Sequence, residues 1–87
     1  MDDDERQADT LAHLVRMGQR IAERMAAEHP FPWPGDAMVK VSRDIRQKAT
    51  EALPHQSSGT IEAVAQATFS AFLDRSLEIA RLMSPGI

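Results

Sequence analysis

The side chains best suited to proton transfer or metal binding near neutral pH are three histidines, at positions 13, 29 and 55. Asp9 lies four residues before His13, so a helix would place both on one face, as two metal ligands require. The chain has no cysteine, no His-x-x-x-His and no Glu-x-x-His pair to complete a ligand set. We therefore interpret Asp9 and His13 as an exposed pair and expect no metal site.

Nucleophilic and phosphate chemistry have little support in this chain. Ser57 and Ser58 follow His55 closely, but a catalytic serine is defined by spatial roles and an orienting acid, not by adjacency. The stretch from Ser57 to Thr60 holds one glycine and lacks the Gly-Lys-Ser/Thr pattern of a phosphate loop. In a short helical chain, a pocket of several hundred Å³ would compete with the core. We interpret the serines as helix caps and expect no enzyme activity, cofactor or small-molecule substrate.

Basic side chains follow a clearer pattern. Three of them step by four residues and would form one ridge on a helix: Arg16, Arg20 and Arg24. Four more lie in the following segment: Lys40, Arg43, Arg46 and Lys48. The acids concentrate in residues 2–9, so the charge is polarised although the net charge is only −3. We expect the arginine ridge to contact a partner protein, and the second set to contact DNA in an alternative interpretation.

Residues 29–35 form a connecting loop with three prolines at alternate positions, which no helix can cross. The loop carries Phe31 and Trp33, the only tryptophan of the chain. Tryptophan is enriched at binding hot spots, and a proline-rich segment loses little entropy on docking. We therefore include both aromatic residues in the predicted partner-binding set. The alternative is that they fold back and close the end of a helical bundle.

Hydrophobic periodicity predicts one all-α domain of three helices, at about residues 3–28, 36–53 and 58–83, with a short tail at 84–87. Gly18 lies within the apolar stripe of the first helix, either as a tolerated defect or as a point of close helix approach. Asp36 is the expected N-cap of the second helix. Residues 38–42 also alternate as a short strand would, but the helix formers that follow favour a helix.

The core that this chain can build is thin. Thirteen of its hydrophobic residues are alanine, and a domain below about 80 residues rarely gains more than about 3–5 kcal/mol from one core. The third helix has apolar side chains on two sides, so either one side faces a second copy or both sides belong to the core of a compact three-helix fold. The residues predicted to mediate self-association are Phe69, Phe72, Leu73 and Leu77. We expect a dimeric or partner-completed helical bundle.

Two DNA-binding families provide resemblances. Residues 39–45 (Val-Lys-Val-Ser-Arg-Asp-Ile), followed by a helix, a break and a longer helix, resemble a ribbon-helix-helix repressor, which would place Lys40 and Ser42 against bases. Residues 38–83 are similar to the first two helices of a histone fold. The loop at 54–59 is longer than the turn of the first family, and the third histone helix has no room after Met83. We adopt neither family, and both serve as alternatives.

The sequence thus predicts a small, soluble, cytoplasmic interaction protein that binds another protein, a second copy of itself or both, as an adaptor or inhibitor would. Its Ala- and Arg-rich composition is compatible with a bacterial or phage source. No apolar run approaches the roughly 20 residues of a membrane span, so no membrane association is expected. The alternative function is a small dimeric DNA-binding regulator that uses the second helix.

Overall fold

The computed structural model describes residues 3–29 and 33–83. Three α-helices account for almost all of them: α1 (Asp3–Glu28), α2 (Gly35–Ala52) and α3 (Ser58–Met83). The described residues include no strand. The predicted all-α, three-helix fold is therefore confirmed, and every predicted helix boundary lies within one residue of the observed one.

The segment that alternates like a strand, residues 38–42, is helical throughout. A strand would place Val39 and Val41 on one face. In α2, Val41 is buried with Ile45 and Ala49, whereas Val39 is exposed. The resemblance to ribbon-helix-helix repressors requires a strand in this segment, and that expectation is wrong. Lys40 and Ser42 lie on a helix.

The helix starts show which polar residues act as caps. At α3, the Ser57 hydroxyl accepts a hydrogen bond from the backbone N–H of Thr60 at 3.2 Å, so this serine is an N-cap as predicted. At α2, the N-cap position belongs to Pro34, and its side chain makes no capping bond. The prediction that Asp36 caps this helix is wrong, because it lies in the first turn, where the helix dipole favours its negative charge.

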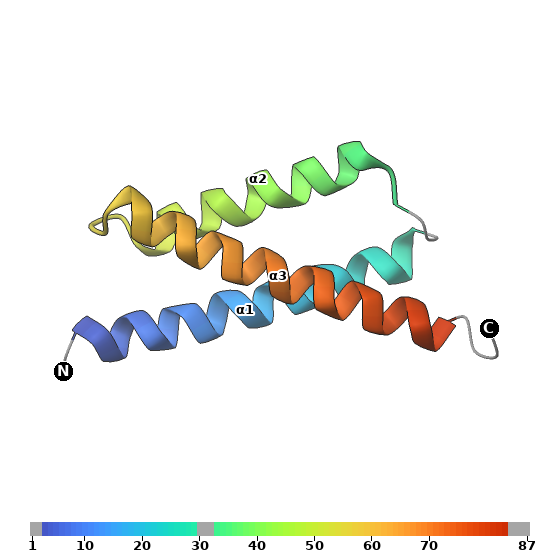
Figure 1. Cartoon of the computed structure of the whole chain (residues 1–87), viewed down its shortest axis with the longest axis horizontal. Coiled ribbons are helices and arrows are strands. Elements are labelled where there is room, and N and C mark those ends of the chain that lie inside the picture. The colour runs from blue at the N-terminus through green and yellow to red at the C-terminus, as the bar shows by residue number, and fades with distance from the viewer. Residues whose placement is uncertain (1–2, 30–32, 84–87) are drawn as a thin grey trace.

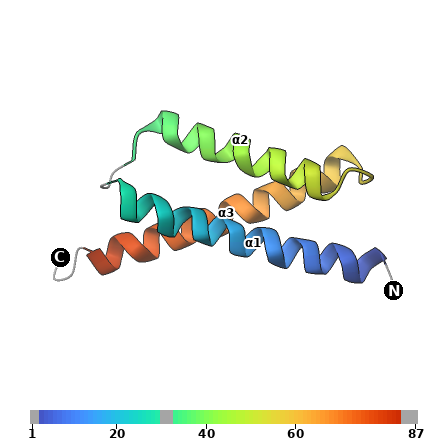
Figure 2. The same ribbon diagram turned by 180° about the vertical axis from the view of Figure 1, so that it is seen from behind.

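The three helices are arranged around α3. Figures 1 and 2 show that α1 and α3 run in the same direction and cross near their middles, while α2 returns in the opposite direction. α3 packs extensively on α1 and also on α2, whereas α1 and α2 touch each other little. The buried apolar side chains come from all three helices and the α2–α3 turn: Leu14, Ala22, Val41, Ile45, Ala49, Leu53, Val64, Ala65 and Phe72.

The backbones of α1 and α3 lie close together at Gly18. A Cβ atom added there would lie 2.6 Å from the backbone oxygen of Thr68 and 3.2 Å from its Cγ2 atom. Of the two interpretations of this glycine, the structure therefore supports close helix approach over a tolerated defect. Thr68 is fully buried at the crossing, and its hydroxyl donates to the backbone oxygen of Val64 at 2.9 Å. The crossing thus buries a polar side chain without leaving it unpaired.

We expect Gly18→Ala to lower the free energy of unfolding by about 1–3 kcal/mol, because the added methyl group meets backbone that cannot rotate away. The measurement is urea unfolding followed by far-UV circular dichroism. Gly35→Ala is the matched control, since its added Cβ would have no neighbour within 4 Å. It should stabilise the chain by about 0.4–1 kcal/mol. Equal behaviour of the two variants would contradict the close approach.

Candidate functional site

A hollow in the surface lies between α1 and α2. It consists of two adjoining parts, of about 630 and 370 Å³, which share Ile21, Arg24 and Asp44. We call this hollow the α1/α2 groove. It also includes these residues: Met17, Arg20, Met25, Glu28, His29, Trp33, Pro34, Ala37, Lys40, Val41, Gln47 and Lys48. The groove exists because both helices pack on α3 and leave the space between them open to solvent.

Each of the two parts of the groove has a volume within the range of about 300–1,000 Å³ that is usual for ligand pockets. The expectation that a pocket of several hundred Å³ would compete with the core is therefore wrong for this chain. The hollow lies between two helices rather than inside the core, so it does not displace the buried side chains that hold α3 in place.

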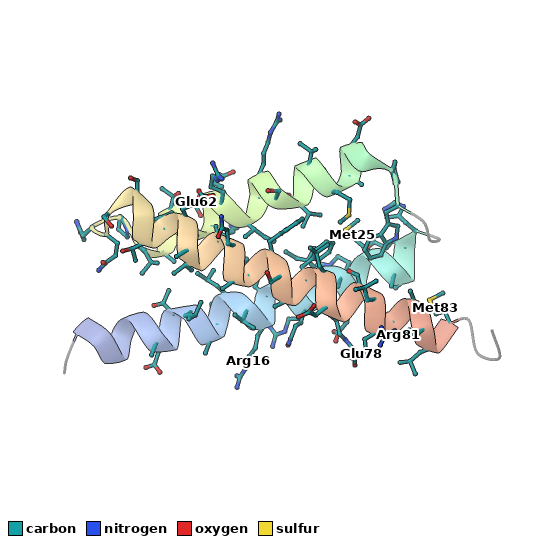
Figure 3. The ribbon with its side chains drawn as sticks, in the orientation of Figure 1. Arg16, Met25, Glu62, Glu78, Arg81 and Met83 are labelled. Carbon is teal, nitrogen blue, oxygen red and sulfur yellow. The ribbon has the colours of Figure 1, made fainter. Side chains whose placement is uncertain are left out.

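The floor of the groove is apolar. Ile21 and Met25 line it from α1, one turn apart, and Val41 lines it from α2. Ile21 and Met25 are half-buried and pack against the core. Figure 3 labels Met25 between α2 and the C-terminal part of α1. A partner side chain entering the groove would therefore meet methyl groups and a thioether, which adapt to varied shapes.

Trp33 lies at the end of the groove where the loop leads from α1 to α2. Its ring stacks on the buried ring of Phe72, with ring centroids 5.8 Å apart, and its Nε1–H donates to the backbone oxygen of His29 at 3.3 Å. The Trp33 side chain is half-buried. It therefore combines the two interpretations from the sequence: it closes the end of the core, and it also lines a groove in which a partner could bind. Phe31, the other predicted aromatic contact, lies outside the described residues.

Cations predominate on the rim of the groove. Four cations line it, Arg20, Arg24, Lys40 and Lys48, against two acids, Glu28 and Asp44. This local excess of positive charge contrasts with the net charge of −3 of the chain. The structure thus brings two of the three ridge arginines together with two of the four cations predicted on the second helix.

The arginine ridge winds around α1, since a step of four residues advances 40° beyond a full turn. Arg24 consequently lines both parts of the groove and Arg20 one part, whereas Arg16 lines neither. Figure 3 shows Arg16 pointing away from the other helices. Among the described residues, none of these three arginines takes part in an ion pair.

The four cations of α2 do not form one surface. Lys40 and Lys48 line the α1/α2 groove, whereas Arg46 points to the other flank and forms an ion pair with Glu62 of α3 at 2.8 Å. Arg43 lines neither part of the groove. A DNA-facing ridge would need these side chains on one face, and their spacing of three, three and two residues spreads them around the helix.

The three histidines, which could serve metal or acid–base chemistry, do not lie together at one site. His13 and His55 are exposed and lie outside the groove, whereas His29 lines it. Over residues 3–29 and 33–83, the structure contains no cluster of three or more His, Cys, Asp or Glu side chains that could hold a metal ion. His29 directly follows Glu28 in the sequence, and both residues are exposed.

The four residues predicted for self-association occupy different environments. Phe72 is fully buried in the core of the single chain, so it does not lie on a face that a second copy could meet. Phe69 is half-buried, with its ring 5.7 Å from that of Phe72. Leu73 and Leu77 are exposed, at 36% and 60%. Of the four residues, only Leu73 and Leu77 are therefore exposed on the surface of α3.

Sequence reasoning missed the residues that form the floor and acidic rim of the groove, namely Ile21, Met25, Val41 and Asp44. The available signal was that Ile21 lies between Arg20 and Arg24 of the ridge, so an apolar residue adjoins the cations. That signal indicates the groove only when the distance between α1 and α2 is known.

Comparison of the chain with protein-family models, with curated proteins and with solved structures finds no match in any of the three. Neither the ribbon-helix-helix nor the histone resemblance gains support from these comparisons. Within the described residues, no helix combines the length and the apolar character needed to cross a bilayer.

We expect Trp33→Ala to lower the free energy of unfolding by about 1–3 kcal/mol, because it removes a half-buried ring that stacks on Phe72. Trp33→Phe keeps a ring in that place and should retain most of the stability. Chemical unfolding monitored by circular dichroism measures both variants. A Trp33→Ala chain as stable as the parent would show that Trp33 does not close the end of the core.

Proposed function

We propose that this chain is a protein-binding module whose α1/α2 groove takes an amphipathic α-helix with acidic side chains from another protein. The observation that carries the proposal is an apolar floor between two helices with a rim on which cations outnumber acids. Helix-in-groove recognition uses this combination of an apolar trough and a charged border.

The dimensions of the groove favour a helix as the occupant. The lining runs from Pro34, the N-cap of α2, to Lys48 within α2, 14 positions apart, which corresponds to about 21 Å of helix axis. A partner helix of about four turns would match this length and present apolar residues at i, i+3, i+4 and i+7. Such a helix would become a fourth helix of the bundle, next to α1 and α2.

The charges favour an acidic partner. Arg20 and Arg24 border the groove on α1, and Lys40 borders it on α2, so cations flank the floor on both sides. Lys48 also interacts with Glu51 at 3.6 Å, an exposed pair one turn apart, which leaves its ammonium group open to further contacts. Acidic residues on the two edges of a partner helix would meet these cations, which speeds association and fixes the orientation of the partner.

The alternative function, a DNA-binding regulator, has less support from the geometry. Its predicted residues diverge around α2, and Arg46 is already paired with Glu62. The cytoplasmic location, the adaptor or inhibitor role and the absence of catalysis remain predictions. The peptide-binding test does not depend on them.

The test uses two synthetic helical peptides without tryptophan, each with leucines at i, i+3, i+4 and i+7. One has glutamates on both edges, and the other has lysines there. Trp33, the only tryptophan of the chain, lines the groove and reports binding by fluorescence. We expect the acidic peptide to bind at least about tenfold more tightly than the basic one.

The variants that test the role of the cations, and their control, all come from the arginine ridge of α1. Arg20→Glu together with Arg24→Glu should weaken acidic-peptide binding about tenfold or more, whereas Arg16→Glu, which lies outside the groove, should not change it. Equal affinity for the two peptides, binding of neither, or an equal effect of Arg16→Glu would overturn the proposal. Salt-dependent retardation of duplex DNA that Arg43→Glu abolishes would instead favour the DNA-binding alternative.

A further inference from the structure

The outer side of α3 carries a second apolar surface, separate from the groove. Leu73 and Leu77 are exposed at 36% and 60%, and Ala80 is half-buried. Their spacing of four and three residues makes one row along the helix. The row is turned away from Thr68 and Phe72, the residues that pack at the crossing with α1. None of the three residues lines the α1/α2 groove.

We propose that two copies of the chain associate through this face of α3, with their α3 helices antiparallel and the two-fold axis beside Leu77. The proposal rests on the order of charges along the edge of the row. It does not depend on the proposed function, because the groove and the row share no residue.

The charges that select this arrangement are Asp74 and Arg81. They lie seven residues apart, about two helical turns, and so share one edge of the apolar row. Both are exposed, and neither takes part in an ion pair within the described part of the chain. The neighbouring charges on α3 differ in this respect, since Arg75 is paired with Glu23 at 3.2 Å and with Glu78 at 2.6 Å.

A two-fold axis brings together residues that lie equally far from it in the two copies. The midpoint between Asp74 and Arg81 falls between Leu77 and Glu78. An axis at that level therefore places Asp74 of each copy beside Arg81 of the other, which makes two reciprocal ion pairs. It also brings Leu77 of each copy against the segment from Leu77 to Ala80 of the other. The aliphatic stem of each Arg81 would cover Leu73 of the opposite copy.

The parallel arrangement does not use these charges. In a parallel two-fold dimer, the edge that carries Asp74 and Arg81 lies on opposite sides of the interface in the two copies, so the two edges do not meet. Only the antiparallel arrangement brings the two edges together and forms the reciprocal ion pairs. The order of the charges is therefore complementary to itself only when the two helices run in opposite directions.

The single chain also has a structural reason to associate. Among the described residues, nine apolar side chains are buried, and three of these are alanines, at positions 22, 49 and 65. The radius of gyration of the chain is 14.3 Å, against about 12 Å for a compact domain of this length. Figure 1 shows that the ends of α1 and α3 diverge beyond their crossing. An α3–α3 contact would bury leucines that the single chain leaves in water.

The test measures the mass of the full chain by sedimentation velocity from low micromolar to millimolar concentration. We expect a species of twice the 9.6 kDa chain mass. Leu77→Glu should weaken dimerisation about tenfold or more, since it places two carboxylates beside the axis. Leu82→Glu is the matched control, because Leu82 is also exposed, at 70%, but lies on another side of α3. It should leave the dimer unchanged.

A charge exchange tests the orientation of the two helices. Asp74→Arg alone and Arg81→Asp alone should each weaken the dimer about tenfold or more, and the chain with both changes should regain most of the parental affinity. A monomer at every concentration, equal effects of Leu77→Glu and Leu82→Glu, or failure of the double exchange to restore the dimer would overturn the proposal. Circular dichroism of each variant confirms that the helices are retained.

Discussion

The structure depends on the contact between the backbones of α1 and α3 at Gly18. A side chain of any size at this position would approach the Thr68 backbone oxygen to 2.6 Å. Because the two helices are so close, few large side chains are needed to fill the space around the crossing, where Leu14, Ala22 and Phe72 are buried. A chain with few large aliphatic residues can thus build a continuous core by bringing the helix axes together instead of filling a wide gap.

The same arrangement creates the surface features of the molecule. α3 is the central helix, and α1 and α2 occupy two flanks of it while touching each other little. The space between them becomes the α1/α2 groove, and the remaining flank of α3 keeps the row of Leu73, Leu77 and Ala80 open. The two proposed interactions therefore use different surfaces. In Figure 1 α3 lies in front of α1 at the crossing, and in Figure 2 α1 lies in front.

Local sequence patterns predicted the helices and much of the core, but not the details that depend on neighbours. Val41, Ile45, Ala49 and Leu53 are spaced four residues apart, and all four are buried, because an amphipathic helix needs another element to cover its apolar face. Asp36 was a sound cap by type, yet the helix begins one residue earlier, at Gly35, with Pro34 at the N-cap position. The groove was not predicted, since its two walls belong to different helices and the space between those helices depends on how each packs on α3.

The sequence by itself determined the number of helices, their ends and the faces they bury, because periodicity, prolines and turn-forming residues act over a few neighbouring residues. Only the tertiary structure decided that Gly18 is a contact point, that Phe72 is interior, and that Arg24 borders a groove while Arg16 does not. Each of these depends on which helix lies opposite and how near it is. That distance is set by side-chain packing between segments far apart in the chain, and no local pattern encodes it.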